Sequence, residues 1–408
     1  MDNLVHTTFG GLGQLFDGPH ATPGRLSEGP YFLNISSLRA GRLDLAESDH
    51  VSEEDFERWT RRVTPQPGDL LFSYETRIGE AALMPDGVRA CLGRRMALLR
   101  PDLKVVEPRF LLYFYLGPQF QRTIAQNTIH GATVPRIGLA TMPSWPVVVP
   151  SLPQQRAISE VLGALDDKIA ANHRIDTTAN TLGDALFESV VAASYEIPRA
   201  SMRDLTGEGV LTYGDGYRTK RSEHGQPGMR IVRAGDIQHG RIVLSGEDFV
   251  SNDYISQVGV KACRSRDIVL TTKGTVGRVA VVPDDIPSSV YSPQLCYFRV
   301  AENHGRIQPW LAAWFRSPDR IRQTDIAMHK SDMAPYVNLQ DIGALRVPIV
   351  DLDAFGPTIE QLDSLQNLGH AIARENVALA KTRDELLPLL MSGKLRVKDA
   401  EKKVEEMV

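Results

Sequence analysis

The sequence predicts an α+β protein with two similar globes in tandem, each followed by a long helix, and the two helices pairing as an antiparallel coiled coil. Apolar residues recur every three or four positions from Pro153 to about Val191, and again from Pro357 to about Leu390. At ~1.5 Å per residue the first helix would span roughly 55–60 Å. Its apolar stripe is narrow, so it needs a partner helix. The residues before each helix also repeat one order of motifs.

Composition is that of a soluble protein long enough for two or three domains. The chain has 408 residues, of which 42% are hydrophobic and 24% are charged. No apolar run approaches the ~18–20 residues needed to cross a membrane, and the start of the chain lacks a signal-peptide pattern. Three cysteines without a CxxC pair argue against a disulfide framework or a zinc site. We therefore expect a cytoplasmic protein without a bound metal or cofactor.

Charge is unevenly distributed along the sequence. The formal net charge is −4, and acidity concentrates in the helical segments: residues 151–195 carry three basic and six acidic residues. The segment 196–350 is mildly basic. A stand-alone DNA-binding protein is usually basic, so a nucleic-acid function would need a partner that supplies part of the positive field.

The first globe is predicted as a mixed arrangement of short strands and helices, because several strands follow one another too closely for intervening helices. Ser52 before Glu53 and Glu54 suits a helix N-cap, with Asp55 three residues on. The expected elements are two strands within Tyr31–Leu45, a helix at Ser52–Trp59, strands at Asp69–Ser73, Glu80–Met84 and Arg94–Pro101, and a helix at Pro108–Gln126.

The second globe repeats the first, which indicates an internal duplication. Gly68–Asp86 aligns without gaps with Arg266–Asp284, and both Gly79 with Gly277 and Pro85 with Pro283 are 198 positions apart. The separation grows slowly to 203 in the helices. The expected divisions are a first globe at 1–150, a helical spacer at 151–195, a second globe at 196–350, a second spacer at 351–397 and a charged, frayed tail at 398–408.

The two helices are expected to act as a rigid spacer between two globes that contact one extended ligand. Double-stranded DNA is such a ligand, with half-sites about one turn, ~34–36 Å, apart. The residues expected to pack the helices together are apolar and spaced by three or four: Ile158, Leu162, Leu165, Ile169, Leu182, Leu186, Leu362, Leu365, Leu368, Ile372, Leu379 and Leu386.

Several stretches closely resemble type I restriction-modification specificity subunits. They are LPQQRAISEVLGALDDKIAANHRI (152–175), TRDELLPLLMSGKLRV (382–397), GDLLFS with GEAALMPDG, its second copy RDIVLTTKGTVGRVAVVPD, and DGPHATP (17–23). The resemblance covers essentially the whole chain. It departs at Asn367–His370, which replaces a more acidic pattern of the first helix.

The resemblance implies a role without catalysis of its own. In this family each globe is a target recognition domain that reads one half of a split DNA sequence. The helices dock two adenine-methyltransferase subunits, and motor-nuclease subunits complete the restriction complex. Because the two globes differ, the DNA target should be asymmetric.

Candidate DNA-binding residues are polar or basic side chains in turns and loops, since such groups contact base edges and phosphates. Solvated hairpin turns, strand-edge pairs and ordinary loop geometry remain the alternatives. In the first globe the candidates are Tyr74, Thr76, Arg77, Arg94, Arg95, Thr133 and Arg136. In the second they are Arg218, Lys220, Arg221, Lys273, Thr275, Arg278, Gln294, Lys330, Ser331 and Tyr336.

Signatures of catalysis are weak. Asp69 with Glu75 faintly suggests a nuclease pair, but Asp69 and Asp267 are better explained as turn residues before a strand. The histidines show no metal-ligand spacing, and neither a phosphate-binding GxxxxGK[ST] loop nor an Asn-Pro-Pro-[Phe/Tyr] string occurs. Two other functions stay open: a scaffold whose globes bind protein, and an enzyme with an unrecognised nuclease centre.

Overall fold

The computed structural model describes residues 4–39, 41–131, 134–193, 197–328, 336–405 and 407. The chain forms two compact units. Unit 1 comprises Met1–Asn172 and Glu375–Val408, and unit 2 comprises His173–Arg374. The boundary passes through both long helices, so each unit contains one globe together with part of each long helix.

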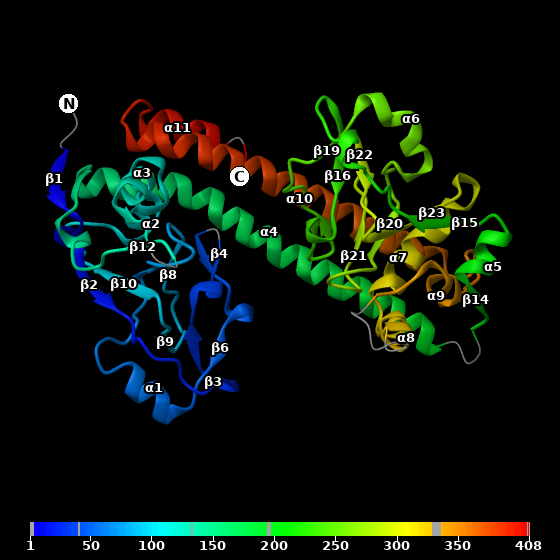
Figure 1. Ribbon diagram of the computed structural model, residues 1–408, viewed down its shortest axis with the longest axis horizontal. Helices are drawn as coiled ribbons and strands as arrows, with labels where there is room; N and C mark the ends of the chain where they lie inside the picture. Colours follow the sequence, from blue (N-terminus) through cyan, green and yellow to red (C-terminus); the bar gives the residue numbers. More distant parts are fainter. Residues whose placement is uncertain are drawn as a thin grey trace. The chain divides into compact units, whose positions relative to one another are not determined.

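Globe 1 is built on a four-stranded antiparallel sheet in the order β2 (Gly13–Asp17), β10 (Met96–Pro101), β7 (Leu70–Ser73) and β8 (Ala81–Leu83) (Figure 1). A second sheet places β3 (Leu26–Leu33) between β6 (Asp49–His50) and β9 (Ala90–Leu92). Short pairs join β1 (Val5–Thr8) to β13 (Pro146–Val149), β4 (Leu38–Arg39) to β5 (Arg42–Leu43), and β11 (Thr128–Ile129) to β12 (Arg136–Ile137). Leu70 and Phe72 of β7 point into the core under the helices.

Globe 2 repeats the topology of the two larger sheets of globe 1. Its four-stranded sheet runs β15 (Leu211–Asp215), β23 (Leu295–Val300), β20 (Ile268–Thr271) and β21 (Val279–Val281), and its three-stranded sheet runs β19 (Phe249–Ser251), β16 (Gly228–Val232) and β22 (Ser289–Tyr291). The short pairs are β14 (Arg199–Ser201) with β24 (Arg346–Pro348), and β17 (Ile237–Gln238) with β18 (Arg241–Ile242). The predicted fold class is confirmed.

The short helices follow the sequence signals with one correction. α1 (Glu53–Trp59) begins where expected, with the Ser52 hydroxyl accepting a hydrogen bond from the Asp55 N–H. The helix expected at Pro108–Gln126 is instead two, α2 (Pro108–Leu116) and α3 (Pro118–Asn127). Gly117 between them is extended, with ψ 146°, because a residue before proline is disfavoured in the α-helical region.

Globe 2 has the same break between α7 (Gln308–Arg316) and α8 (Pro318–Met328), at Ser317. The remaining short helices of this globe are α5 (Met202–Gly207), α6 (Ile255–Val258) and α9 (Leu339–Ala344).

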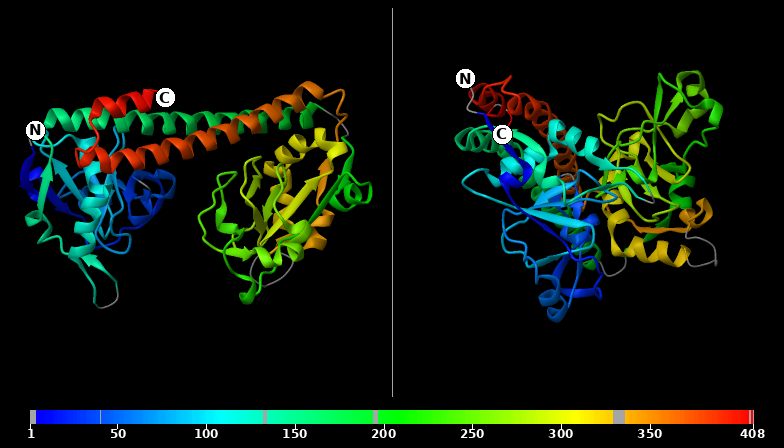
Figure 2. Two further views of the ribbon diagram at one scale, coloured as in Figure 1. Left: turned by 90° about the horizontal axis from the view of Figure 1, so that it is seen from above. Right: turned by 60° about the vertical axis from the view of Figure 1, so that its left-hand side comes forward.

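Within unit 1 the two long helices, α4 (Leu152–Ala193) and α10 (Gly356–Met391), run antiparallel. Asn172 meets Glu375 while Asp166, six residues earlier, meets Arg383, eight residues later. Figure 2 shows the two helices side by side. Leu162, Leu165, Ile169, Leu379 and Leu386 are buried there in the same core as the aromatic residues of α2 and α3.

Asn172 is the buried polar residue of this helix pair. It is 3% exposed, and its amide donates to the Glu375 carboxylate at 2.6 Å and to the Asn376 side-chain oxygen at 2.9 Å. Lys168 adds an ion pair with Glu375 at 3.6 Å. A buried polar contact of this kind fixes the register of paired helices.

Within unit 2 the facing residues are Ala179, Gly183 and Phe187 of α4, with Leu362 and Leu365 of α10. Two expected packing residues need correction, because Leu182 is 50% exposed and Leu368 is 42% exposed. Leu182 lies beside Gly183 on the outer flank of the pair. An apolar stripe with a seven-residue repeat moves gradually around a straight helix, because 3.6 residues per turn do not divide seven evenly. Some apolar residues therefore leave the contact face.

The end of the chain also differs from expectation. The segment expected to fray forms α11 (Val397–Glu405), whose Ala400 and Val404 are buried in the core of unit 1. The apolar spacing of four residues places both side chains on one face, which outweighs the charged composition. Among the described residues, no helix combines the length and apolarity needed to span a bilayer.

Candidate nucleic-acid interface

In globe 1, three segments that carry candidate residues meet at one end of the main sheet. The Tyr74 N–H donates to the Arg95 carbonyl at 3.2 Å, and the Ile137 N–H donates to the Tyr74 carbonyl at 2.8 Å. Glu75 and Arg136 pair as an isolated antiparallel bridge. We call this cluster, residues 74–77, 94–95 and 136–137, reader edge 1.

Globe 2 builds the same backbone frame from matched positions. The Thr272 N–H donates to the Gln294 carbonyl at 2.8 Å, the Val337 N–H donates to the Thr272 carbonyl at 3.0 Å, and Lys273 pairs with Tyr336. Residues 272–275, 294 and 336–337 form reader edge 2. The two frames coincide hydrogen bond for hydrogen bond, so the duplication extends to these turns.

The side chains that leave these frames differ in exposure. Thr76, Arg94 and Arg136 are exposed at reader edge 1, as are Lys273, Thr275, Gln294 and Tyr336 at reader edge 2. Tyr74 is only 8% exposed, and its hydroxyl is hydrogen-bonded to Asp17; burial, then the charge of Asp17, raises its pKa to about 12. Tyr74 therefore supports reader edge 1 from the interior of the globe. Its burial argues against the direct DNA contact expected from the sequence.

Two arginines of the turns are tied to backbone. Arg77 donates to the Ile35 carbonyl at 3.2 Å and lies 3.4 Å from Glu80. Arg278 donates to the Ile237 carbonyl at 3.3 Å. Both arginines hold the hairpin turn against the neighbouring short strands, which gives them a structural task as well as a positive charge.

Arg95 has an unusual conformation. Its backbone is left-handed, with φ 73°, and so is that of Thr76, with φ 71°. Few residues other than glycine adopt this region, and for a β-branched threonine it is an outlier. The Arg95 Nε lies 3.4 Å from a Glu75 carboxylate oxygen but makes no hydrogen bond to a described residue. Strain of this kind clusters at functional sites.

The basic cluster of Arg218, Lys220 and Arg221 lies in the loop between β15 and β16, and all three residues are exposed. Lys220 lies 3.7 Å from buried Glu223. The loop leaves the sheet beside reader edge 2, because the Gly216 N–H donates to the Leu295 carbonyl at 3.1 Å, next to Gln294.

The counterpart loop of globe 1 was missed by the sequence analysis. Gly18 donates to the Met96 carbonyl at 3.0 Å, as Gly216 does to Leu295, and His20 then lies 2.9 Å from Asp17. The signal was present in the sequence: Asp17-Gly18 and Asp215-Gly216 are 198 positions apart. Thr133, Lys330 and Ser331 lie outside the described residues.

Comparisons with known proteins identify this architecture. Residues 37–180 match the family model described as "Type I restriction modification DNA specificity domain". The "Type I restriction enzyme MjaVIII specificity subunit" of Methanocaldococcus jannaschii is 18% identical over 368 residues, covering 86% of this chain and 84% of that protein. The putative MjaX specificity subunit of the same organism is 20% identical over 404 residues, covering 89% and 87%.

A solved structure shares the fold. The type I restriction-modification system S subunit from M. genitalium is similar over 96% of both chains, with a TM-score of 0.58 and 16% identity. Residues 37–180 carry the DNA specificity domain of type I restriction-modification systems, and the chain is similar to specificity subunits over most of its length. The resemblance seen in the sequence is thereby confirmed.

The two repeats of this chain anchor an equivalent glycine by different side chains. Gly79 and Gly277 have φ of 91° and 94°. The Gln121 amide donates to the Gly79 carbonyl at 3.1 Å, and the Arg320 guanidinium donates to the Gly277 carbonyl at 3.2 Å. Arg320 is 3% exposed, and burial lowers its pKa to about 10.

The acidic residues considered as nuclease candidates are bound to arginine. Asp69 accepts two hydrogen bonds from Arg100, at 3.0 and 2.7 Å, and Asp267 accepts two from Arg299, at 2.8 and 2.6 Å. Both carboxylates are buried next to β7 and β20. Within the part of the chain that the structure describes, no three His, Cys, Asp or Glu side chains are grouped to hold a metal ion.

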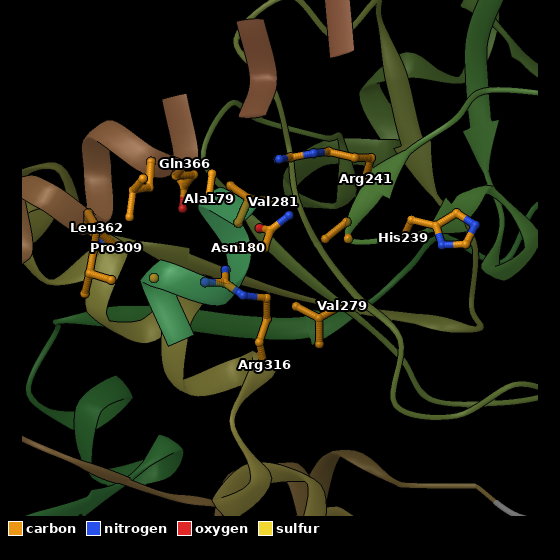
Figure 3. A pocket seen from close by; sticks show the side chains of 14 residues that line it. Ala179, Asn180, His239, Arg241, Val279, Val281, Pro309, Arg316, Leu362 and Gln366 are labelled. Carbon is orange, nitrogen blue, oxygen red and sulfur yellow. The ribbon is translucent and has the colours of Figure 1, made fainter. Parts of the chain in front are cut away.

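Globe 2 is held to the long helices across a pocket of about 220 Å³ (Figure 3). Arg241 pairs with Asp176 of α4, and the Arg316 Nε donates to Asp184 at 3.0 Å. In Figure 3 Arg316 points toward Asn180 of α4, while His239 points away. A side chain at Gly369 would collide with Arg241 unless that arginine moved.

Proposed function

We propose that this chain is the non-catalytic specificity subunit of a cytoplasmic type I restriction-modification complex. Globe 1 reads one half of a bipartite, asymmetric double-stranded DNA target, and globe 2 reads the other half. The helix pair docks two methyltransferase subunits, and motor-nuclease subunits join the same complex. The relatives that support this proposal are named specificity subunits.

One observation carries the proposal. The two globes offer the same backbone frame, with the same three connections, to different exposed side chains. Reader edge 1 presents Arg94 and Arg136, whereas reader edge 2 presents Gln294 and Tyr336. A constant frame with variable polar tips suits reading of base edges, and the difference between the tips predicts an asymmetric target.

The exposed cations add a sequence-independent contribution. Arg218 and Arg221 make no ion pair with any residue that the structure describes. Their loop leaves the sheet beside reader edge 2. Neutralising phosphates with such residues releases counterions and makes binding fall with salt. We therefore assign the cluster with Lys220 to phosphate contacts. Alanine at all three positions should weaken binding to every sequence and flatten its salt dependence.

The helix pair offers a docking strip in unit 2. Ile175, Leu182 and Leu368 are 48%, 50% and 42% exposed. Ile175 and Leu182 are seven residues apart and therefore share one flank of α4. That flank is opposite Asp176 and Asp184, which face globe 2. An amphipathic helix laid along this flank of α4 would bury Ile175 and Leu182, and we assign it to a methyltransferase subunit.

Co-purification tests the docking strip. Leu182→Glu places a charge in the proposed interface and should abolish retention of the methyltransferase subunit. Val260→Glu is the matched control, because Val260 is 62% exposed but lies in the globe. Retention that is unchanged by Leu182→Glu, or equally reduced by Val260→Glu, contradicts docking at the strip.

A base-modification map of host DNA, with and without the gene, tests the function itself. We expect a two-part asymmetric motif with methyladenine that disappears when the gene is deleted. A map that does not depend on the gene would favour the scaffold alternative. A labelled-duplex titration with the methyltransferase present then decides, since a scaffold adds no sequence preference.

A further inference from the structure

We propose that Arg95 reads a guanine in the half-site of globe 1, and that Gln294 reads an adenine in the half-site of globe 2. This inference rests on the proposed function and deepens it, because it names the base that each globe selects. Arginine pairs bidentately with the O6 and N7 acceptors of guanine, and glutamine with the N6 donor and N7 acceptor of adenine.

The two residues occupy one structural position. Each offers its carbonyl to the first residue of the facing turn, Arg95 to Tyr74 at 3.2 Å and Gln294 to Thr272 at 2.8 Å. The two residues are equivalent in these hydrogen bonds, but Arg95 has a left-handed backbone, with φ 73°, whereas Gln294 does not.

Arg95 is positioned in advance for this contact. Glu75 lies 3.4 Å from its Nε, and the Thr76 hydroxyl lies 3.5 Å from one terminal nitrogen. The Nε is buried without a hydrogen-bond acceptor among the described residues. Because the buried Nε faces Glu75 and the Arg95 side chain is 33% exposed, the guanidinium is oriented in advance and its terminal nitrogens are the donors left for a base. Arg94 is exposed and makes no ion pair with a described residue, which suits a phosphate contact instead.

The backbone strain at Arg95 separates reading from folding. With φ 73°, the position would be relaxed by glycine. If Arg95 served stability, Arg95→Gly would lower the melting temperature. If it serves recognition, Arg95→Gly should leave the melting temperature unchanged or raise it, and should remove one base preference.

The experiment uses the complex with the methyltransferase subunit and duplexes that carry the motif from the modification map. Each guanine is replaced in turn by 7-deazaguanine, which lacks the N7 acceptor. We expect one replacement in one half-site to weaken wild-type binding by about 5- to 150-fold. The same replacement should have no effect on the Arg95→Gly complex. With Gln294→Ala, 7-deazaadenine in the other half-site should behave in the same way.

Arg89→Ala is the control for the loss of one positive charge. Arg89 lies outside reader edge 1, and its guanidinium forms an ion pair with Glu53 at 2.9 Å. The inference is overturned if Arg95→Gly stays sensitive at every guanine, if it weakens all sequences equally as a phosphate contact would, or if the half-site lacks guanine. A wild-type complex without any sequence preference would instead reject the proposed function, and the inference with it.

Discussion

Removal of the Asp267 carboxylate should be among the most destabilising single changes in unit 2. Asp267 is 1% exposed and accepts hydrogen bonds from Arg299, from the Tyr291 hydroxyl at 2.7 Å and from the Arg264 N–H at 3.1 Å. The Arg299 side chain is itself only 14% exposed. Asp267→Ala leaves that charge buried and unpaired, which costs about 3–5 kcal/mol.

The repeat supplies a graded comparison. Asp69 in globe 1 makes the same pair, but the Arg100 side chain is 31% exposed and can turn toward water. Asp69→Ala should therefore cost less, about 1.5–3 kcal/mol. Asp353→Ala is the control, since its ion pair with Arg306 is exposed on both sides and contributes about 0–1 kcal/mol.

Urea unfolding followed by hydrogen exchange measures the free energy of unfolding of each unit separately. The amides of β20 and β23 report on unit 2, and those of β7 and β10 report on unit 1. The reasoning is refuted if Asp267→Ala costs no more than Asp353→Ala, or if Asp69→Ala costs more than Asp267→Ala. A metal-dependent DNA cleavage that disappears with Asp267 while stability stays unchanged would revive the nuclease alternative.

Three further predictions concern the helices and turns. Asn172→Leu should raise the melting temperature of the complex yet allow a second helix register, detectable by cysteine cross-linking along α4 and α10; a single register would refute this. Burial, and then the charge of Arg241, lowers the pKa of His370 from its usual 6.5, so the unfolded chain binds the proton more readily and unit 2 should lose stability as pH falls below about 6.5. His370→Gln should flatten that dependence in urea unfolding, and an unchanged slope would contradict it. Gly79→Ala should cost more than about 1 kcal/mol and more than Gly277→Ala, because the Gln121 side-chain oxygen fills the space of the new methyl group while the Gly277 side has room; equal thermal shifts would contradict this.

Much of the fold could be predicted because duplication makes each signal appear twice. Gly79 and Gly277 mark equivalent turns, and the structure places both in left-handed backbone. The long helices were predicted from apolar spacing, which is reliable over many turns. The break at Gly117 could have been predicted from Pro118, because proline disfavours helix in the residue before it.

The candidate site was only partly predictable, because it depends on which segments meet. Sequence spacing identified the turns that carry Arg95 and Arg136, but their meeting point depends on backbone hydrogen bonds between distant residues. The burial of Tyr74 and its bond to Asp17 are consequences of tertiary packing. Leu182 was expected to pack against α10, but half of it is exposed. An apolar residue on the flank of a helix can face either solvent or a partner helix, and periodicity does not distinguish the two.

The net charge of −4 looks unfavourable for a DNA-binding chain, but the arrangement of ion pairs removes the difficulty. Several arginines away from the reader edges are held by carboxylates: Arg100 by Asp69, and Arg109 and Arg383 by acids of α4. Arg94 and Arg136 have no such partner among the described residues. The field that DNA meets is set by these unpaired cations within about one Debye length, ~8–10 Å, and not by the total. Reversing an exposed charge on α10, as in Lys381→Glu, should therefore change DNA affinity far less than Arg136→Glu, although both alter the net charge equally; equal losses of affinity would show that the total charge governs binding.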